Sequence, residues 1–381
     1  MGPLAGVKIV ELAGIGPGPM CAMVLADLGA TVLRVDRAEP ATDLGIPRPL
    51  KANLIMRGRY QIALDLKKPD GLAAAMKLIE GADGLIEGFR PGVTERLGLG
   101  PDECLKRNPK LVYGRMTGWG QTGPLAKVAA HDTNYIAITG VLNAIGRKGQ
   151  PPALPLNLIG DFGGGSMYLA VGMLAAIIEA RQSGQGQVVD AAIVDGTLSL
   201  GAQMFGSFAA GIITADRGEN VTDTGAYYME CYECKDGKYV SVASIEKRFY
   251  LELCQRIGVD PAAIGEHTDK ANWEKGKQIF TAKFREKTRA EWTALLEGTD
   301  ACFGPVLNWA EAPEHPHLKA RDCFVEVDGI VQPVPAPRFS RSVPDIPIGP
   351  QAVTPENTNL ALASWLSAAE VAGLRKAGTI A

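Results

Sequence analysis

The sequence is poor in cysteine and lacks the cysteine spacing of a disulfide-rich or zinc-binding protein. Seven cysteines are scattered through 381 residues, and only Cys231 and Cys234 form a Cys-x-x-Cys pair. An odd, dispersed set argues against a disulfide framework in a chain of this length. A structural zinc site commonly uses a second such pair, which the sequence does not contain. We therefore interpret both residues as thiols of a strand that precedes an Asp-Gly turn, and we predict no metal site.

Long apolar runs and an excess of charge of one sign are lacking too. No stretch near twenty residues is free of polar breaks, so no membrane-spanning helix is predicted. A formal net charge of −3 offers no bulk attraction for nucleic acid or anionic lipid. The N-terminus has no basic, apolar secretory start, and the residues from Gly378 to Ala381 do not form a peroxisomal signal. A cytoplasmic enzyme is therefore the expectation.

Strands and helices alternate through the first part of the chain. Apolar runs predict the strands, and helical patterns opened by proline or closed by glycine predict the helices between them. The predicted strands are 7–12, 31–35, 62–66, 84–87, 111–115 and 188–193, and the predicted helices include 20–28, 69–79 and 161–181. Short links between alternating elements indicate a parallel sheet with helices on its faces. The predicted fold class is α/β, with a large Rossmann-like domain.

The pattern changes in the second part of the chain. A hairpin is predicted for residues 227–243, and a helix that begins at Thr288 has Glu291 as its capping-box partner. We expect a large domain over residues 1–224, a smaller α+β domain over 225–320, and a segment over 321–381 that returns to the large domain.

The glycine-rich turn at residues 14–19 follows a strand, as in dinucleotide-binding folds. The Gly-x-Gly-x-x-Gly fingerprint needs a third glycine for close packing of the helix on the strand, and Pro19 occupies that position. We interpret the segment as a tight structural turn of an α/β sheet and predict no nicotinamide cofactor.

Seven segments in a fixed order carry a resemblance over nearly the whole chain. They are residues 10–19, 27–30, 33–37, 87–92, 115–124, 131–135 and 160–165, and they include the sequences Glu-Gly-Phe-Arg-Pro-Gly, Gly-Trp-Gly-Gln-Thr-Gly-Pro and His-Asp-Thr-Asn-Tyr. The chain resembles the family III coenzyme A transferases and, within them, the α-methylacyl-CoA racemases. The resemblance implies an acyl-CoA substrate and an interlocked homodimer with shared active sites. Coenzyme A is then part of the substrate, and no separate cofactor is expected.

The resemblance assigns proton transfer to His131 and Asp161, with Glu246 of the other subunit as an orienting partner. Glu246 lies in an Ile-Glu-x-x-Phe-Tyr segment, where Lys247 and Arg248 replace the expected Pro-Gln. In the transferases of the family, the aspartate that matches Asp161 attacks the thioester and forms an anhydride. A CoA transferase is therefore the alternative, against which His131 and Glu246 argue. A non-enzymatic acyl-CoA-binding protein is a third hypothesis, which the presence of all three residues disfavours.

Racemisation needs a base on one face of the α-carbon and an acid on the other. His131 and Asp161 can exchange these roles cheaply if their proton affinities are close, so we expect burial to raise the pKa of Asp161. Asp132 either orients His131 or another catalytic group, or simply caps a helix. Asp161 is expected to cap its own helix, and Gly163 to Gly165 are expected to let the thioester approach free N–H groups there.

The resemblance also implies where coenzyme A binds. Its phosphates suit the planar guanidinium group of arginine. The matching positions are Arg37, Leu64, Asp65, Leu66, Lys67, Gly88, Phe89, Arg90, Arg96, Ala130, Thr133, Asn134 and Tyr135. For Lys67 a solvated surface charge is an equal alternative. His267, His315 and His317 lie outside any motif, and we interpret them as structural or surface residues.

Overall fold

The chain folds as two compact units. The computed structural model describes residues 1–39, 46 and 48–380. The first unit comprises Met1–Thr139, Leu156–Gly201 and Asp322–Ala381, and the second comprises Gly140–Pro155 and Ala202–Arg321. The sequence prediction began the smaller domain at residue 225, whereas the contacts also place 140–155 and 202–224 in it.

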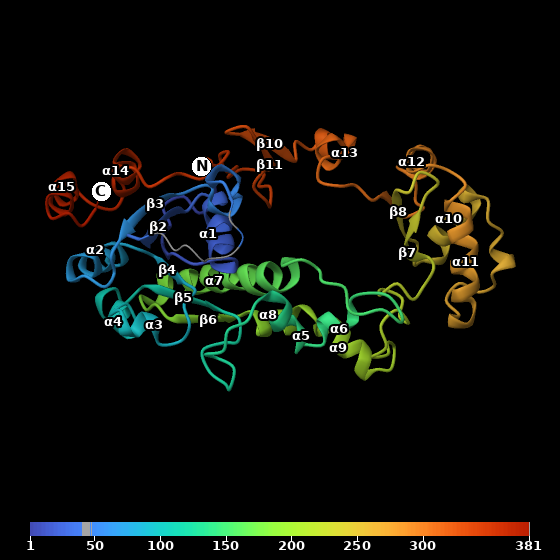
Figure 1. The fold of residues 1–381 in the computed structure, drawn as a ribbon, viewed down its shortest axis with the longest axis horizontal. Coiled ribbons are helices and arrows are strands. Elements are labelled where there is room, and N and C mark those ends of the chain that lie inside the picture. The colour runs from blue at the N-terminus through green and yellow to red at the C-terminus, as the bar shows by residue number, and fades with distance from the viewer. Residues whose placement is uncertain (40–45, 47, 381) are drawn as a thin grey trace. The chain divides into compact units, whose positions relative to one another are not determined.

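A six-stranded parallel sheet forms the centre of the first unit (Figure 1). Its order is β3 (Tyr60–Leu64), β2 (Thr31–Arg37), β1 (Lys8–Leu12), β4 (Gly84–Glu87), β5 (Val112–Thr117) and β6 (Val188–Ala192). Val10 of β1 is in register with Leu33 on one side and Leu85 on the other. The α/β fold is therefore confirmed. The strand order reverses between β1 and β4, and such sheets bind ligands in the crevice outside the strand ends at that point.

Helices cover both faces of this sheet, because successive strand side chains point to opposite sides. Val10 and Leu12 pack into one core, whereas Ile9 packs into the other. The first core includes α2 (Pro69–Glu80), α4 (Pro101–Arg107), α14 (Pro355–Leu362) and partly buried residues of α15 (Ala368–Lys376). The second includes α1 (Pro17–Asp27) and α7 (Tyr168–Ser183).

The remaining elements of the first unit are short. They are α3 (Val93–Arg96), α5 (Asp132–Ala137), α8 (Ile193–Leu200), the antiparallel pair β10 (Phe324–Val327) and β11 (Ile330–Pro333), and the 3-10 helices Leu50–Ala52 and Leu54–Met56. Buried Arg57 ties the C-terminal segment to α1: its guanidinium group pairs with Asp27 at 2.6 Å and donates to the Pro333 carbonyl at 2.7 Å.

The helix predicted for 161–181 begins earlier than expected. A π-helix, η3 (Leu158–Met167), runs directly into α7, and Asn157 precedes it. Asp161 lies inside the first turn, so the prediction that Asp161 caps this helix was wrong. Residues 158–183 form the one helix in the described part of the chain that is long and apolar enough to span a membrane by length and composition. Leu169, Met173 and Ile177 on its inner side belong to the core against the sheet.

The second unit has a small antiparallel sheet packed with helices. The sheet contains β7 (Met229–Glu233), β8 (Tyr239–Ala243) and β9 (Phe303–Pro305). The helices are α6 (Val141–Ala144), α9 (Ala202–Ala209), α10 (Lys247–Ile257), α11 (Trp273–Phe284), α12 (Arg289–Leu296) and α13 (Pro316–Ala320), with 3-10 turns at Pro261–Ala263, Lys270–Asn272 and Ala312–Glu314. Its core is aromatic and includes Tyr227, Tyr250, Phe280 and Trp292. The predicted hairpin and the capping box of Thr288 with Glu291 are both confirmed.

Candidate active site

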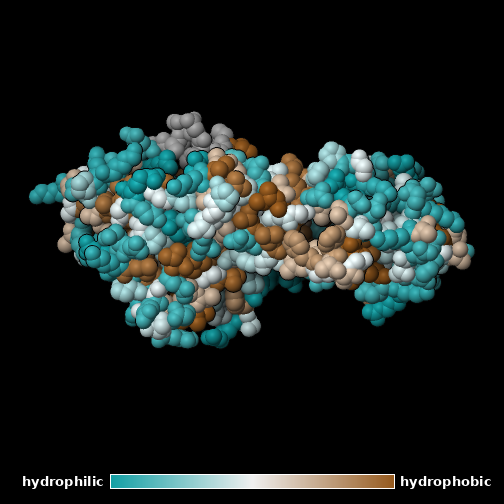
Figure 2. All heavy atoms as spheres, turned by 90° about the horizontal axis from the view of Figure 1, so that it is seen from below, coloured by the Kyte–Doolittle hydropathy of each residue, from teal (hydrophilic) through white to brown (hydrophobic). Residues whose placement is uncertain are grey.

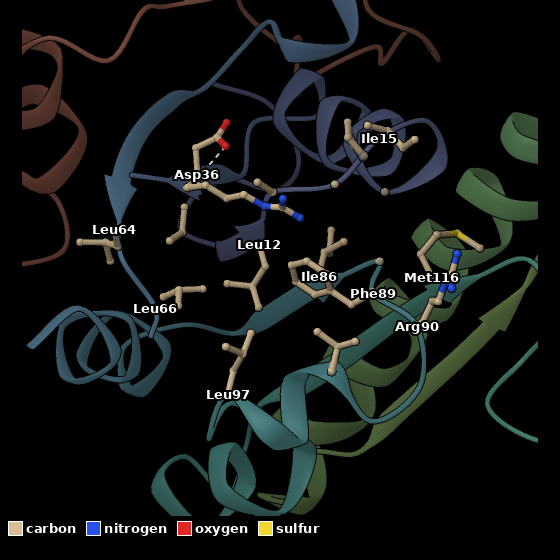
Figure 3. Close-up of a pocket in the computed structure, with 18 of the residues that line it drawn as sticks. Leu12, Ile15, Asp36, Leu64, Leu66, Ile86, Phe89, Arg90, Leu97 and Met116 are labelled. Carbon is tan, nitrogen blue, oxygen red and sulfur yellow. Dashed lines mark hydrogen bonds between the residues drawn. The ribbon is translucent and has the colours of Figure 1, made fainter. Parts of the chain in front are cut away.

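A pocket of about 1470 Å³ opens at the strand ends of the first unit, where the order of the strands reverses. Leu12, Asp36, Leu64 and Ile86 mark the ends of β1 to β4 around it (Figure 3). Twelve of the predicted site residues line it: Arg37, Leu64, Asp65, Leu66, Lys67, Gly88, Phe89, Arg90, Ala130, His131, Tyr135 and Asp161. The predicted binding segments and the two predicted proton-transfer residues therefore share one cavity.

The pocket wall combines apolar surface with unpaired cations. Leu12, Leu66, Phe89, Leu97 and Met116 are among the apolar side chains around it (Figure 3). The basic residues Arg37, Lys67 and Arg90 also line it, and none of the three forms an ion pair with a described residue. Such a cavity suits a ligand that has both an apolar part and negative charges.

Buried ion pairs hold two loops that line the pocket. One loop follows β1 and the other follows β4, the two strands between which the order of the sheet reverses. Glu11, in β1, is fully buried and contacts Arg34 at 2.5 Å and Arg59 at 2.7 Å. Arg34 also donates to the Gly14 carbonyl at 3.2 Å, which anchors the glycine-rich turn that lines the pocket. Sequence analysis missed this role, although an acidic residue inside an apolar strand is a signal that could have revealed it.

A second buried glutamate, Glu87, holds the loop that follows β4. Glu87, at the end of β4, pairs with Arg115 at 2.8 Å and accepts the Phe89 N–H at 2.7 Å. Burial raises the pKa of Glu87, and the Phe89 N–H and the guanidinium group oppose that rise. The backbone of Phe89 is thereby held where its loop lines the pocket.

Asp132 positions the backbone of Asp161. The buried Asp132 carboxylate accepts the Asp161 N–H at 2.6 Å, and it also accepts a backbone hydrogen bond from Gly160. Of the alternatives left open by the sequence, orientation of another catalytic group therefore fits Asp132. Asp132 itself does not line the pocket.

The same contact brings two carboxylates close together. Burial raises the pKa of Asp161 to about 6, and the negative charge of Asp132 adds to that rise. The Asn157 amide and the charge of protonated His131 act in the opposite direction. The predicted rise in the pKa of Asp161 is present, and its first cause is the predicted one.

His131 lies exposed at the start of α5, and two side chains hold the peptide group that joins it to Ala130. Asn134 accepts the His131 N–H at 3.1 Å, and the Tyr135 hydroxyl donates to the Ala130 carbonyl at 2.5 Å. Thr133 and Asn134 were predicted to contact coenzyme A, but neither lines the pocket. The structure gives Asn134 a role in the backbone that carries His131.

The glycines after Asp161 serve helix packing. A Cβ on Gly164 would lie 2.5 Å from the Thr197 hydroxyl of α8, and one on Gly165 would lie 3.2 Å from Pro17 of α1. The Asp161 N–H is already bonded to Asp132. The prediction that these glycines expose free N–H groups to the thioester was therefore wrong: they let neighbouring helices approach closely. Instead, Gly16, with φ of 64°, puts its backbone against the Asp161 carboxylate, where a Cβ would be 3.3 Å from Oδ2.

Arg96 and Glu246, like Asp132, Thr133 and Asn134, lie outside this cavity. Arg96, in α3, does not line it, and a Cβ on Gly92 would lie 3.2 Å from an Arg96 guanidinium nitrogen. Glu246 belongs to the second unit, where it is exposed just before α10. Among residues 1–39, 46 and 48–380, no group of three or more His, Cys, Asp or Glu side chains could hold a metal ion.

Comparisons with known proteins match this chain along most of its length. A sequence model of CoA-transferase family III matches residues 4–358. An α-methylacyl-CoA racemase of Mus musculus is 42% identical over 346 residues, which are 90% of this chain and 88% of that protein. The corresponding protein of Homo sapiens is 41% identical and covers 88% of this chain and 86% of its own length. The crystal structure of a CAIB/BAIF family protein from Brucella suis has a TM-score of 0.79 at 24% identity, covering 95% of this chain and 99% of its own, which shows the fold alone.

We expect Asp132→Asn to lower the pKa of Asp161. Asparagine keeps an acceptor oxygen for the Asp161 N–H but removes the negative charge that raises this pKa. The measurement is carboxyl-carbon NMR titration of Asp161, with Asp195→Asn in α8 as a control. An Asp161 titration that is identical in wild type and Asp132→Asn would contradict the coupling.

Proposed function

Because the chain belongs to CoA-transferase family III, as the motifs predicted, we propose that it interconverts the (R) and (S) forms of 2-methylacyl-CoA thioesters. The single observation that carries the proposal is that His131 and Asp161 line the same pocket, with the pKa of Asp161 raised to about 6. The relatives that are 41–42% identical are α-methylacyl-CoA racemases, which supports the same reaction here.

In the proposed reaction, one of these two residues removes the α-proton and the other returns a proton to the opposite face. The electron pair of the broken C–H bond moves into the thioester as an enolate, and the new C–H bond restores it. Histidine side chains ordinarily ionise near ~6.5 and aspartates near ~3.9. Raising the pKa of Asp161 brings its proton affinity toward that of an imidazole, so exchange of roles after each turnover costs little free energy.

The remaining pocket residues bind the thioester. The phosphates of coenzyme A fit the unpaired Arg37, Lys67 and Arg90, and the apolar wall accommodates the carbon chain. The N-terminal end of α1 also lines the pocket beside Asp161, and its partial positive charge favours the developing enolate. Coenzyme A enters as part of the substrate.

A homodimer would complete the site. Exposed apolar side chains of the first unit include Val171, Ile178, Leu198 and Leu200. Figure 2 shows apolar side chains among the polar ones on one face of the molecule. Exposed apolar surface of this kind is typical of a subunit interface. We propose that a second copy covers it and supplies Glu246 as the partner of His131 and Asp161.

A CoA transferase that uses Asp161 as a nucleophile is the second candidate, because the family includes such enzymes. The decisive experiment incubates a chiral 2-methylacyl-CoA in deuterated water without any added carboxylic acid. We expect deuterium at the α-carbon and decay of optical activity toward a near-even mixture. In a parallel incubation with an added carboxylic acid, passage of coenzyme A to that acid with no α-exchange would establish the transferase instead.

Variants of the two proton-transfer residues should affect the two enantiomers differently. We expect His131→Ala and Asp161→Asn each to lower inversion by at least about 10², the usual contribution of a general acid–base. Each variant should retain more α-proton exchange for the enantiomer that faces its remaining base. Solvent exchange is measured for each enantiomer, with melting temperature as the folding control. Full racemisation by His131→Ala would exclude the two-base scheme.

Mixed dimers test the shared site. In a dimer of one Asp161→Asn chain and one Glu246→Gln chain, one site keeps both Asp161 and Glu246 if they come from different subunits. We expect such dimers, isolated through two different tags, to recover about half of the wild-type rate from two weakly active parents. Recovery of no activity would place both residues in the same subunit's site.

A further inference from the structure

His267 is held on every side in the second unit. Only 3% of its surface is exposed, and its ring stacks on Tyr250 with centroids 4.6 Å apart and an interplanar angle of 10°. Tyr228 contacts it edge-on at 5.1 Å. Its Nε2 lies 3.1 Å from the Ile245 carbonyl, and its Nδ1 lies 3.0 Å from a Glu266 carboxylate oxygen. A buried histidine with both nitrogens engaged and its ring stacked on a tyrosine has one orientation.

The Ile245 carbonyl belongs to the peptide group that joins Ile245 to Glu246. A carbonyl oxygen only accepts, so Nε2 carries the hydrogen in this contact. The chain is also held on either side: the Ser244 hydroxyl donates to the Ala301 carbonyl at 2.8 Å, and the Glu246 carbonyl accepts the Tyr250 N–H at 3.0 Å. His267 therefore fixes the remaining free peptide plane of this short segment.

The Glu246 side chain, in contrast, is left free. It is exposed, and among the described residues it has no ion pair or hydrogen-bond partner. The two cations that follow it are otherwise engaged: Lys247 pairs with Glu266 at 3.0 Å, and Arg248 lies 4.3 Å from the Phe249 ring centre. Glu266 thus contacts both His267 and Lys247.

We propose that His267 is a positioning residue that fixes the backbone of Glu246, so that the Glu246 carboxylate can orient the proton-transfer residues. The inference rests on the proposed function, in which Glu246 joins His131 and Asp161. A rigid peptide plane with an unpaired carboxylate is the arrangement expected of an orienting group, because any slack in its backbone would be carried to the carboxylate. Sequence analysis left His267 as a structural or surface residue.

A matched pair of amides tests the contact with Ile245. In His267→Gln the amide nitrogen reaches the place of Nε2, whereas in His267→Asn it reaches only the place of Nδ1. We expect the asparagine variant to lose about tenfold in kcat, the factor typical of one lost hydrogen bond to a buried group, with the KM for the thioester little changed. We expect the glutamine variant to stay near the wild-type kcat.

A double-mutant cycle with Glu246→Gln shows whether His267 acts through Glu246. In the Glu246→Gln background, adding His267→Asn should cause no further fall in kcat, because the group being positioned has already been changed. If His267→Asn does not fold, His267→Phe takes its place, since it keeps the ring stacking and loses both polar contacts. Melting temperatures accompany every variant.

Three results would overturn the inference. Equal losses in the glutamine and asparagine variants, in proportion to their melting temperatures, would assign His267 a structural role only. If the fall in kcat of the double variant equals the product of the falls in the two single variants, His267 acts independently of Glu246. Full racemisation by Glu246→Gln would remove the group being positioned; if Asp161→Asn is inactive at the same time, the racemase function still stands.

Discussion

The structure of the first unit depends on burying charge at the ends of its central strands. Glu11 and Glu87 sit at the neighbouring strands β1 and β4, where the sheet order reverses and the pocket opens. A buried carboxylate is costly unless it is paired, so each requires its arginines. In return, each pair holds a loop: Arg34 binds the Gly14 carbonyl, and Glu87 binds the Phe89 N–H. The pocket is thus shaped by polar contacts beneath it.

The chemistry of the site depends on a contact between the Asp132 carboxylate and the backbone of Asp161. Asp132 accepts the Asp161 N–H and fixes that residue's backbone, but its charge also makes ionisation of Asp161 harder. Burial is the first cause of the raised pKa of Asp161, and the Asp132 carboxylate that fixes its backbone adds to that rise. A neutral acceptor would supply the position only. This is a physical reason for two adjacent acids in a site in which only one of them lines the pocket.

The second unit provides a rigid frame around a different acid. Its aromatic core surrounds His267, and His267 fixes the peptide before Glu246. The two units therefore prepare an acidic side chain for the proposed reaction in different ways. Asp161 is half-buried and its pKa is raised, whereas Glu246 is exposed and its backbone is held by hydrogen bonds.

The sequence by itself determined the helices and strands whose patterns are local. It also contained the motifs that identify the family. Strand–helix alternation, the hairpin around Asp236 and the Thr288 capping box all depend on residues a few positions apart. The motifs likewise located most of the pocket wall, because residues at the ends of parallel strands meet at one edge of the sheet.

Only the tertiary structure decided which partners distant residues meet. The packing of Gly164 on Thr197 and the contact of Asp132 with Asp161 join segments that are separated along the chain. No local pattern distinguishes a capping aspartate from one inside the first turn, or a glycine that admits a ligand from one that admits a helix. No local pattern indicates the role of the buried His267 either, since that role depends on Ile245, 22 residues away. Close packing sets these contacts, and it is a property of the folded chain as a whole.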